Sequence, residues 1–169
     1  PPPPPPEPWG DELSFGIALG GFNLSRTIEK IFHNPDNSIE IIYTEYDGLY
    51  SADPPGEYRR VVYRKSDGAW QSPVILKEYW FGAEDQNNLV SFRTFDVVKA
   101  PNGDIHIAYQ GGVGVGLPEL DSTEIFYLHI AGGAKVAEKR ISNDTTESSY
   151  PKIAVRGSDG RVFIAWVQG

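Results

Sequence analysis

The chain has 169 residues, of which 40% are hydrophobic, 12% aromatic and 22% charged, which is typical of a globular protein and excludes a disordered one. Its 15 Lys and Arg and 23 Asp and Glu give a net charge of -8. Phosphate backbones and anionic membranes are therefore repelled on average, and we expect no nucleic-acid partner. No apolar run reaches the ~18 residues of a membrane helix, so no membrane insertion is expected. The absence of Cys excludes disulfides and thiolate metal sites.

The chain begins with a proline run, PPPPPPEP, at residues 1–8. Proline fixes φ and removes backbone donors, so this run favours an extended polyproline II conformation over a packed strand or helix. We therefore interpret residues 1–12 as a proline-rich linker or stalk. The alternative is a ligand for an aromatic groove on a partner.

Beyond the proline run, one motif occurs three times: NPDNSIEIIY at 34–43, APNGDIHIAY at 100–109 and GSDGRVFIAW at 157–166. Each copy is a turn followed by period-two alternation that ends in an aromatic residue, which predicts a strand with one apolar face. That face carries Ile39, Ile41 and Tyr43 in the first copy, Ile105, Ile107 and Tyr109 in the second, and Val162, Ile164 and Trp166 in the third. Asn37, Gly103 and Gly160 occupy the same turn position, where we expect a positive φ.

A further strand precedes each turn, at 27–33, 92–99 and 150–156, and forms a hairpin with the motif strand. Two more strands about a tight turn follow in 58–76 and again in 122–142. No stretch shows helical periodicity. The sequence thus predicts an all-β fold built from units of four consecutive antiparallel strands.

Units of this kind are typical of propeller blades, which bury their faces by stacking on neighbours. We expect residues 13–169 to form an incomplete β-propeller domain with about two complete blades and parts of a third. The blades cover about 26–80 and 90–142, and the partial blade combines 149–169 with 13–22. Propellers close with four to eight blades, so we expect closure by further copies or by missing chain.

The segment from Pro151 to Trp166 resembles the inner hairpin of sialidase-like propellers, which are built from BNR or Asp-box repeats. The turn Ser66, Asp67, Gly68 and Trp70 resembles the Asp-box itself, although it is shorter, and the second unit has Ile130-Ala-Gly-Gly133 in its place. The resemblance covers about residues 26–169. It implies that these turn residues, with Gly103, Gly160 and Trp166, mark the blades structurally and take no part in catalysis.

Sialidases of this fold hold a carboxylate with three Arg residues and use a Glu-activated Tyr nucleophile and an Asp acid/base. Arg26 and Arg93 lie near the starts of inner strands, but the third unit has Tyr150 and Pro151 at that place. We therefore assign no catalytic residue and keep Arg26 and Arg93 as ligand-binding candidates; the alternative is ordinary surface arginines. The carboxylates do not select a catalytic pair, and alternation places several of them toward solvent: Glu29, Glu40, Glu45, Asp96, Asp104 and Glu124.

Tyr79 and Trp80 are candidates for stacking on a sugar ring, and their alternative role is to fill the gap between blades. His33, His106 and His129 lie on different strands without short ligand spacing. We interpret them as a turn histidine and two solvent-facing strand histidines, so we expect no metal and no cofactor. Asn23 and Asn143 begin sequons that would permit N-glycosylation of an exported chain.

These features favour a secreted, non-enzymatic β-propeller module at the cell surface or outside the cell. It would assemble with further copies of itself or with the rest of a longer chain, or bind extracellular polymers, in particular glycans. One alternative is a fragment of a sialidase-like glycoside hydrolase. Another is a structural subunit that polymerises through its open blade edge.

Overall fold

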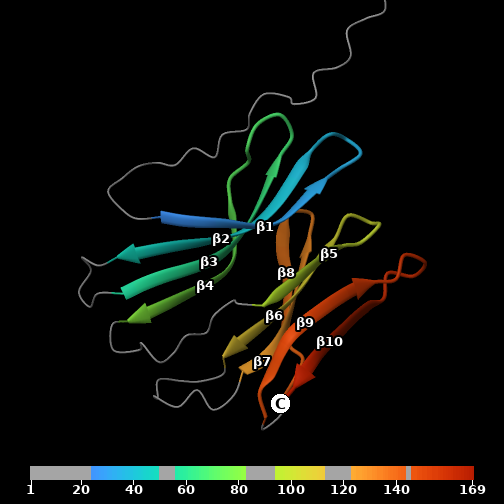
Figure 1. Cartoon of the computed structure of the whole chain (residues 1–169). Helices are drawn as coiled ribbons and strands as arrows, with labels where there is room; N and C mark the ends of the chain where they lie inside the picture. Colours follow the sequence, from blue (N-terminus) through green and yellow to red (C-terminus); the bar gives the residue numbers. More distant parts are fainter. Residues whose placement is uncertain (1–23, 50–55, 83–93, 113–122, 144–145) are drawn as a thin grey trace, which may run out of the picture.

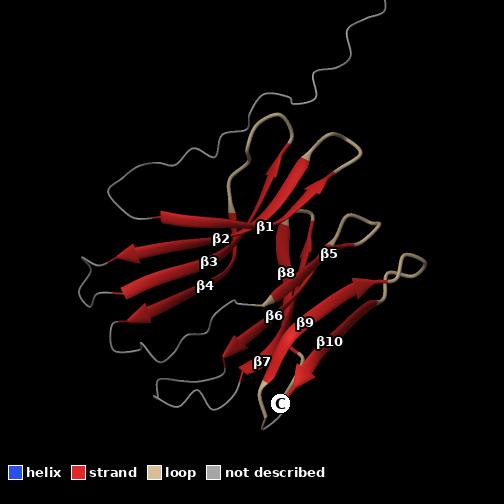
Figure 2. Ribbon diagram, in the orientation of Figure 1, coloured by secondary structure: helices blue, strands red, loops and turns tan. Residues whose placement is uncertain are grey.

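The structure is a computed structural model that describes residues 24–49, 56–82, 94–112, 123–143 and 146–169. All regular secondary structure in these residues is β (Figure 2). The described part therefore holds no helix long and apolar enough to cross a membrane.

Within the described ranges, ten strands form three antiparallel sheets of four, four and two strands, with no closed barrel among them. Each sheet is a simple meander in chain order, which confirms the predicted all-β class and the units of consecutive antiparallel strands. The first sheet consists of β1 (Leu24–His33), β2 (Ile39–Leu49), β3 (Gly56–Ser66) and β4 (Val74–Gly82). The second consists of β5 (Phe95–Lys99), β6 (Ile105–Gly112), β7 (Thr123–Ala131) and β8 (Ala134–Arg140), and the third of β9 (Ser148–Val155) and β10 (Val162–Gln168).

The predicted units at 26–80 and 90–142 each contain one of the four-stranded sheets, and residues 149–169 contain most of the two-stranded one. The segments 1–12 and 13–22 lie outside the described residues. In the three motif turns, φ is 62° at Asn37, 92° at Gly103 and 69° at Gly160. The predicted positive φ is thus confirmed at all three positions.

The second sheet lies between the other two (Figure 1). One of its faces shares a hydrophobic core with the first sheet, in which Ile42, Val61 and Leu76 pack with Ile105 and Leu128. Its other face meets β9, where the backbone N of Ile153 donates a hydrogen bond of 3.1 Å to Asp96 Oδ2. Because β6 is covered from both sides, none of the residues from Ile105 to Tyr109 is more than 6% exposed.

The sheets stack front to back. The motif face of the second sheet, with Ile107 and Tyr109, packs against the first sheet. The matching face of the first sheet, with Ile41 and Tyr43, belongs to a separate cluster on the opposite side of that sheet. Equivalent faces of consecutive sheets therefore point the same way, so each contact joins two different surfaces.

Candidate functional site

The repeats place a hydrogen-bonded polar pair at equivalent positions of the first two sheets. Glu40 and His106 occupy the same place in the motif, and Tyr63 and Tyr127 occupy the same place on the third strand, opposite Ile42 and Ala108. Tyr63 donates a hydrogen bond of 2.8 Å to Glu40 Oε1, and Tyr127 OH lies 2.7 Å from His106 Nδ1. Glu40 is 7% and His106 6% exposed. Each pair thus satisfies a buried polar group on the face that looks toward the next sheet.

In the first sheet this pair extends into an ion pair with the second sheet. Lys99 Nζ contacts Glu40 Oε2 and donates a hydrogen bond of 2.7 Å to Asn34 Oδ1. Burial and the hydrogen bond to Glu40 raise the pKa of Tyr63, so its hydroxyl stays protonated and donates. A groove of about 1150 Å³ opens above these groups, lined by the turns of both sheets and also by Asp104.

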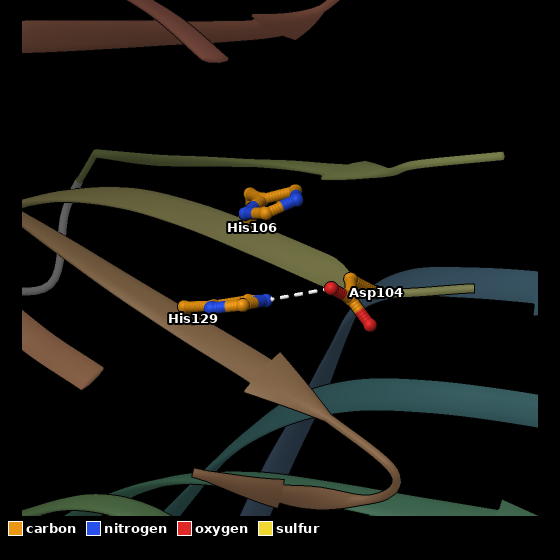
Figure 3. A group of neighbouring side chains, drawn as sticks. All are labelled: Asp104, His106 and His129. Carbon is orange, nitrogen blue, oxygen red and sulfur yellow. Dashed lines mark hydrogen bonds and ion pairs between the residues drawn. The ribbon is translucent and has the colours of Figure 1, made fainter. Parts of the chain in front are cut away.

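In the second sheet the polar position forms part of a cluster of Asp104, His106 and His129 (Figure 3). His106 on β6 lies directly opposite His129 on β7, and the two imidazoles stack with centroids 4.7 Å apart and planes 16° apart. His129 Nε2 lies 2.9 Å from Asp104 Oδ2. Three potential ligand atoms, a ring nitrogen of each histidine and a carboxylate oxygen of Asp104, all lie within 4.8 Å of one another.

The register shows which way this cluster faces. Asp96, Ala108 and Tyr127 are successive cross-strand partners and therefore lie in one row on the same face of the second sheet. Asp96 accepts the hydrogen bond from β9. Because alternate residues of a strand share a face, His106 lies on this side too, which is the side of the third sheet. Asp104 precedes β6 and contacts His129, the cross-strand partner of His106, on the same side.

The cluster is partly open to water and electrostatically coupled. The side chains of His129 and Asp104 are 24% and 23% exposed. The hydrogen bond from His129, supported by one from Asn102, holds the pKa of Asp104 below its usual range. Burial, followed by the neighbouring His129, lowers the pKa of His106, so its ring is neutral at pH 7. Burial and the charge of Asp104 raise the pKa of Tyr127.

This arrangement corrects the expectation that His106 and His129 are solvent-facing strand histidines, because His106 is buried. The two histidines lack a short ligand spacing because strand pairing between distant segments brings the two rings together. Alignment of the first two motifs would have pointed to the site, since it places His106 at the position of Glu40. The pairing partners Tyr127, Lys99 and Asn102 were missed. His33, expected in a turn, is the last residue of β1 and is exposed.

Two of the scattered carboxylates are also buried rather than solvent-facing. Glu40 pairs with Lys99 and Tyr63, as described above. Glu124 is fully buried and contacts both the Arg140 guanidinium and the Ser142 hydroxyl. In both cases a cationic side chain and a hydrogen bond compensate the hydration that the carboxylate loses on burial. We therefore interpret both as structural groups.

The turn that resembles an Asp-box links β3 to β4. Ser66 and Trp70 form an isolated β-bridge across it, and Gly68 has a φ of 102°. Asp67 Oδ2 accepts a hydrogen bond of 3.2 Å from the side chain of Gln71. Trp70 packs against the cluster on the outer face of the first sheet. These contacts hold the turn onto its own sheet.

The ligand-binding candidates are not brought together by any described contact. Arg26 in β1 pairs through its backbone with Glu45 in β2. Tyr79 and Trp80 in β4 pair through their backbones with Arg59 and Tyr58 in β3. For these three candidates the structure describes only the backbone. Arg93 and Asn23 lie outside the described residues, and Asn143 is exposed. Trp166 lies in β10 and is half-buried, with Gly160 in the turn before it.

Two imidazoles and a carboxylate can act together as nitrogen and oxygen ligands of a metal ion, or as a structural polar network between sheets. Comparison of the chain with models of known protein families found no match. Comparisons with curated proteins and with solved structures found none either.

Proposed function

We propose that this chain is a non-enzymatic assembly and binding module, in which stacked sheets act as blades of a propeller completed by further copies of the same chain. One observation carries the proposal. The position that is buried as Glu40 and as His106 in the first two sheets is Phe163 in the third, and Phe163 is 52% exposed. An apolar ring at a position that is an interface in both other repeats marks a third interface.

The surroundings of Phe163 support this reading. Val167 lies on the same strand and is 56% exposed. In the described part of the chain, β10 pairs with β9 alone, so its other edge has backbone groups free to pair with another strand. The third sheet therefore has both an apolar outer face and an open edge.

The front-to-back stacking specifies what would cover this face. Within the chain, the motif face of the second sheet, with Ile107 and Tyr109, covers the first sheet. By the same arrangement, the motif face of a sheet in another copy would cover the face that carries Phe163. A contact between two different surfaces of identical units is heterologous, and it generates a ring when the rotation closes. A ring of such sheets is the architecture of a propeller.

The ligand of the assembled module is proposed on sequence grounds. Extracellular glycans fit the resemblance to sialidase-like repeats. Tyr63 and Glu40 are hydrogen-bonded residues of the types that sialidases use as nucleophile and base, but Tyr63 is 3% exposed and its pKa is raised, so we assign this pair a structural role. Binding to an array of glycans by the assembled material tests this part. Hydrolysis of a fluorogenic sialoside by the chain would overturn the non-enzymatic role.

Sedimentation and light scattering of the 169-residue chain test the assembly. We expect the mass of the unchanged chain to rise with concentration above the 18.7 kDa of one chain. The double variant Phe163→Ser, Val167→Ser should remain closer to the mass of one chain. Val136→Ser is the matched control, because Val136 is also exposed, at 54%, but lies on β8 of the second sheet, which is the sheet covered on both faces within one chain. A monomeric chain at all concentrations that fails to bind a hydrophobic dye would contradict the proposal.

A further inference from the structure

We propose that Asp104, His106 and His129 form a binding site for one divalent transition-metal ion, such as zinc. This site goes beyond the assembly role and does not depend on it. Two imidazole nitrogens and one carboxylate oxygen are a ligand set that zinc uses in proteins. Calcium and magnesium prefer oxygen ligands alone, so this set disfavours them.

The backbone already places the three residues correctly. His106 and His129 are direct cross-strand partners, and Asp104, two residues before His106, lies beside His129. Their ligand atoms lie within 4.8 Å of one another. Two ligands at 2.0–2.1 Å from a tetrahedral zinc ion lie about 3.3 Å apart, so the ligand atoms must move inward in addition to the ring rotation described next.

Metal binding would replace the hydrogen bond between His129 Nε2 and Asp104 Oδ2. The N and O atoms, 2.9 Å apart, separate slightly, each donates a lone pair to the ion, and the proton between them passes to solvent. The stacked rings are nearly parallel, so their lone pairs converge only after one ring turns about its Cβ–Cγ bond. His129 is the ring that can turn, because it is partly exposed and this torsion has a broad energy minimum.

Neighbouring groups support two of the three ligands. Tyr127 OH holds His106 Nδ1 at 2.7 Å, which leaves Nε2 of that ring as the ligand atom. Asn102 Nδ2 donates a hydrogen bond of 3.0 Å to Asp104 Oδ2 itself, which orients the carboxylate and leaves this oxygen another lone pair for the ion. Metal-binding histidines are commonly oriented through their second nitrogen, and the ligating carboxylates are hydrogen-bonded as well.

The site is accessible from solvent. The side chains of Asp104 and His129 are 23% and 24% exposed. An ion could reach these two ligands from solvent and complete its coordination with water. We therefore expect a three-ligand site with one open position.

Calorimetric titration of the tag-free 169-residue chain with zinc chloride tests the site. We expect one ion per chain, and visible absorption bands of tetrahedral cobalt when cobalt chloride is used instead. Asp104→Ala and His129→Ala should each weaken binding by on the order of 100-fold or more, and Tyr127→Phe by about 10- to 100-fold. His33→Ala is the matched control, because His33 is exposed on β1 outside the cluster; it should bind zinc like the unchanged chain.

Three results would overturn the proposal: no zinc binding by the unchanged chain, equal binding by His129→Ala, or equal loss in His33→Ala. Circular dichroism of each variant distinguishes lost ligation from lost folding. His129→Gln provides a second, milder variant at the partly exposed ligand. It keeps a polar side chain beside Asp104 and should still lose zinc, so zinc binding by folded His129→Gln at full affinity also overturns the site.

Discussion

Lys77 Nζ lies 2.6 Å from Glu138 Oε1, and this ion pair joins β4 of the first sheet to β8 of the second. Tyr109 also donates a hydrogen bond to Glu138 Oε1, and Lys135 Nζ lies 3.3 Å from Oε2. Lys135 in turn donates a hydrogen bond to the carbonyl of Leu76. Glu138 thus connects the outer strands of two sheets at the edge of their shared core.

This contact predicts a loss of stability in acid. Burial would raise the pKa of Glu138, but the hydrogen bonds from Lys77 and Tyr109 and the charges of Lys77 and Lys135 outweigh it and hold the pKa below its ordinary value of 4.5. A carboxyl whose pKa is lowered by folding stabilises the fold above its unfolded-state pKa. The contribution should therefore be complete above about pH 5 and decline as pH falls through the folded-state pKa.

Urea unfolding of the unchanged chain and of Glu138→Gln between pH 3 and 7 measures this effect. The variant should be less stable by about 1 kcal/mol at pH 7, and the difference should shrink toward acid. Glu147→Gln changes an exposed carboxylate and serves as the control. A difference that stays constant down to the most acid samples would contradict the assignment.

Leu76 tests the core between the first two sheets. Its side chain is fully buried and packs with residues of both sheets. Leu76→Ala should lower the free energy of unfolding by about 2–5 kcal/mol, because it removes apolar contacts and leaves a cavity. The neighbouring Ile75 points to the other side of β4 and is largely exposed. Ile75→Ala should cost clearly less in the same denaturation experiment, and equal losses would argue against this packing.

The buried Glu124 should depend on its partner Arg140. Arg140→Met would leave a carboxylate without compensating charge in a site where Glu124 has no exposed surface. We expect a loss of about 3–5 kcal/mol. The double variant Arg140→Met, Glu124→Gln should recover part of that loss, because the unpaired charge is gone. A double-mutant cycle in urea gives the coupling, and additive losses would show that the pair is not coupled.

The turn before β6 requires glycine. Gly103 has a φ of 92°, and a Cβ there would meet no other atom, so the cost of Gly103→Ala comes from backbone strain alone. We expect a loss of about 1–2 kcal/mol. Gly157→Ala is the control, since φ at Gly157 lies outside the positive range and its Cβ would make only a van der Waals contact with Pro101. Thermal unfolding of both variants compares them, and equal midpoints would exclude strain at Gly103.

The strands, their hairpins and the positive φ of Asn37, Gly103 and Gly160 could be predicted from the sequence, because alternation and turn chemistry act between neighbours in the chain. Strand ends were less certain: the strand expected at 92–99 is described from Phe95 onward. The Asp-box-like turn could also be located. Its packing partner could not, since Trp70 contacts residues of a different strand.

The candidate site depends on the tertiary structure. Alternation predicts one apolar face for β6, yet the strand is buried on both faces because sheets cover it from either side. His106 therefore becomes a buried group, and the register of β6 with β7 sets His129 beside it. Local patterns thus determined which segments extend and where they turn. Stacking and cross-strand register decided which polar side chains lose water and meet, because those contacts join residues far apart in the chain.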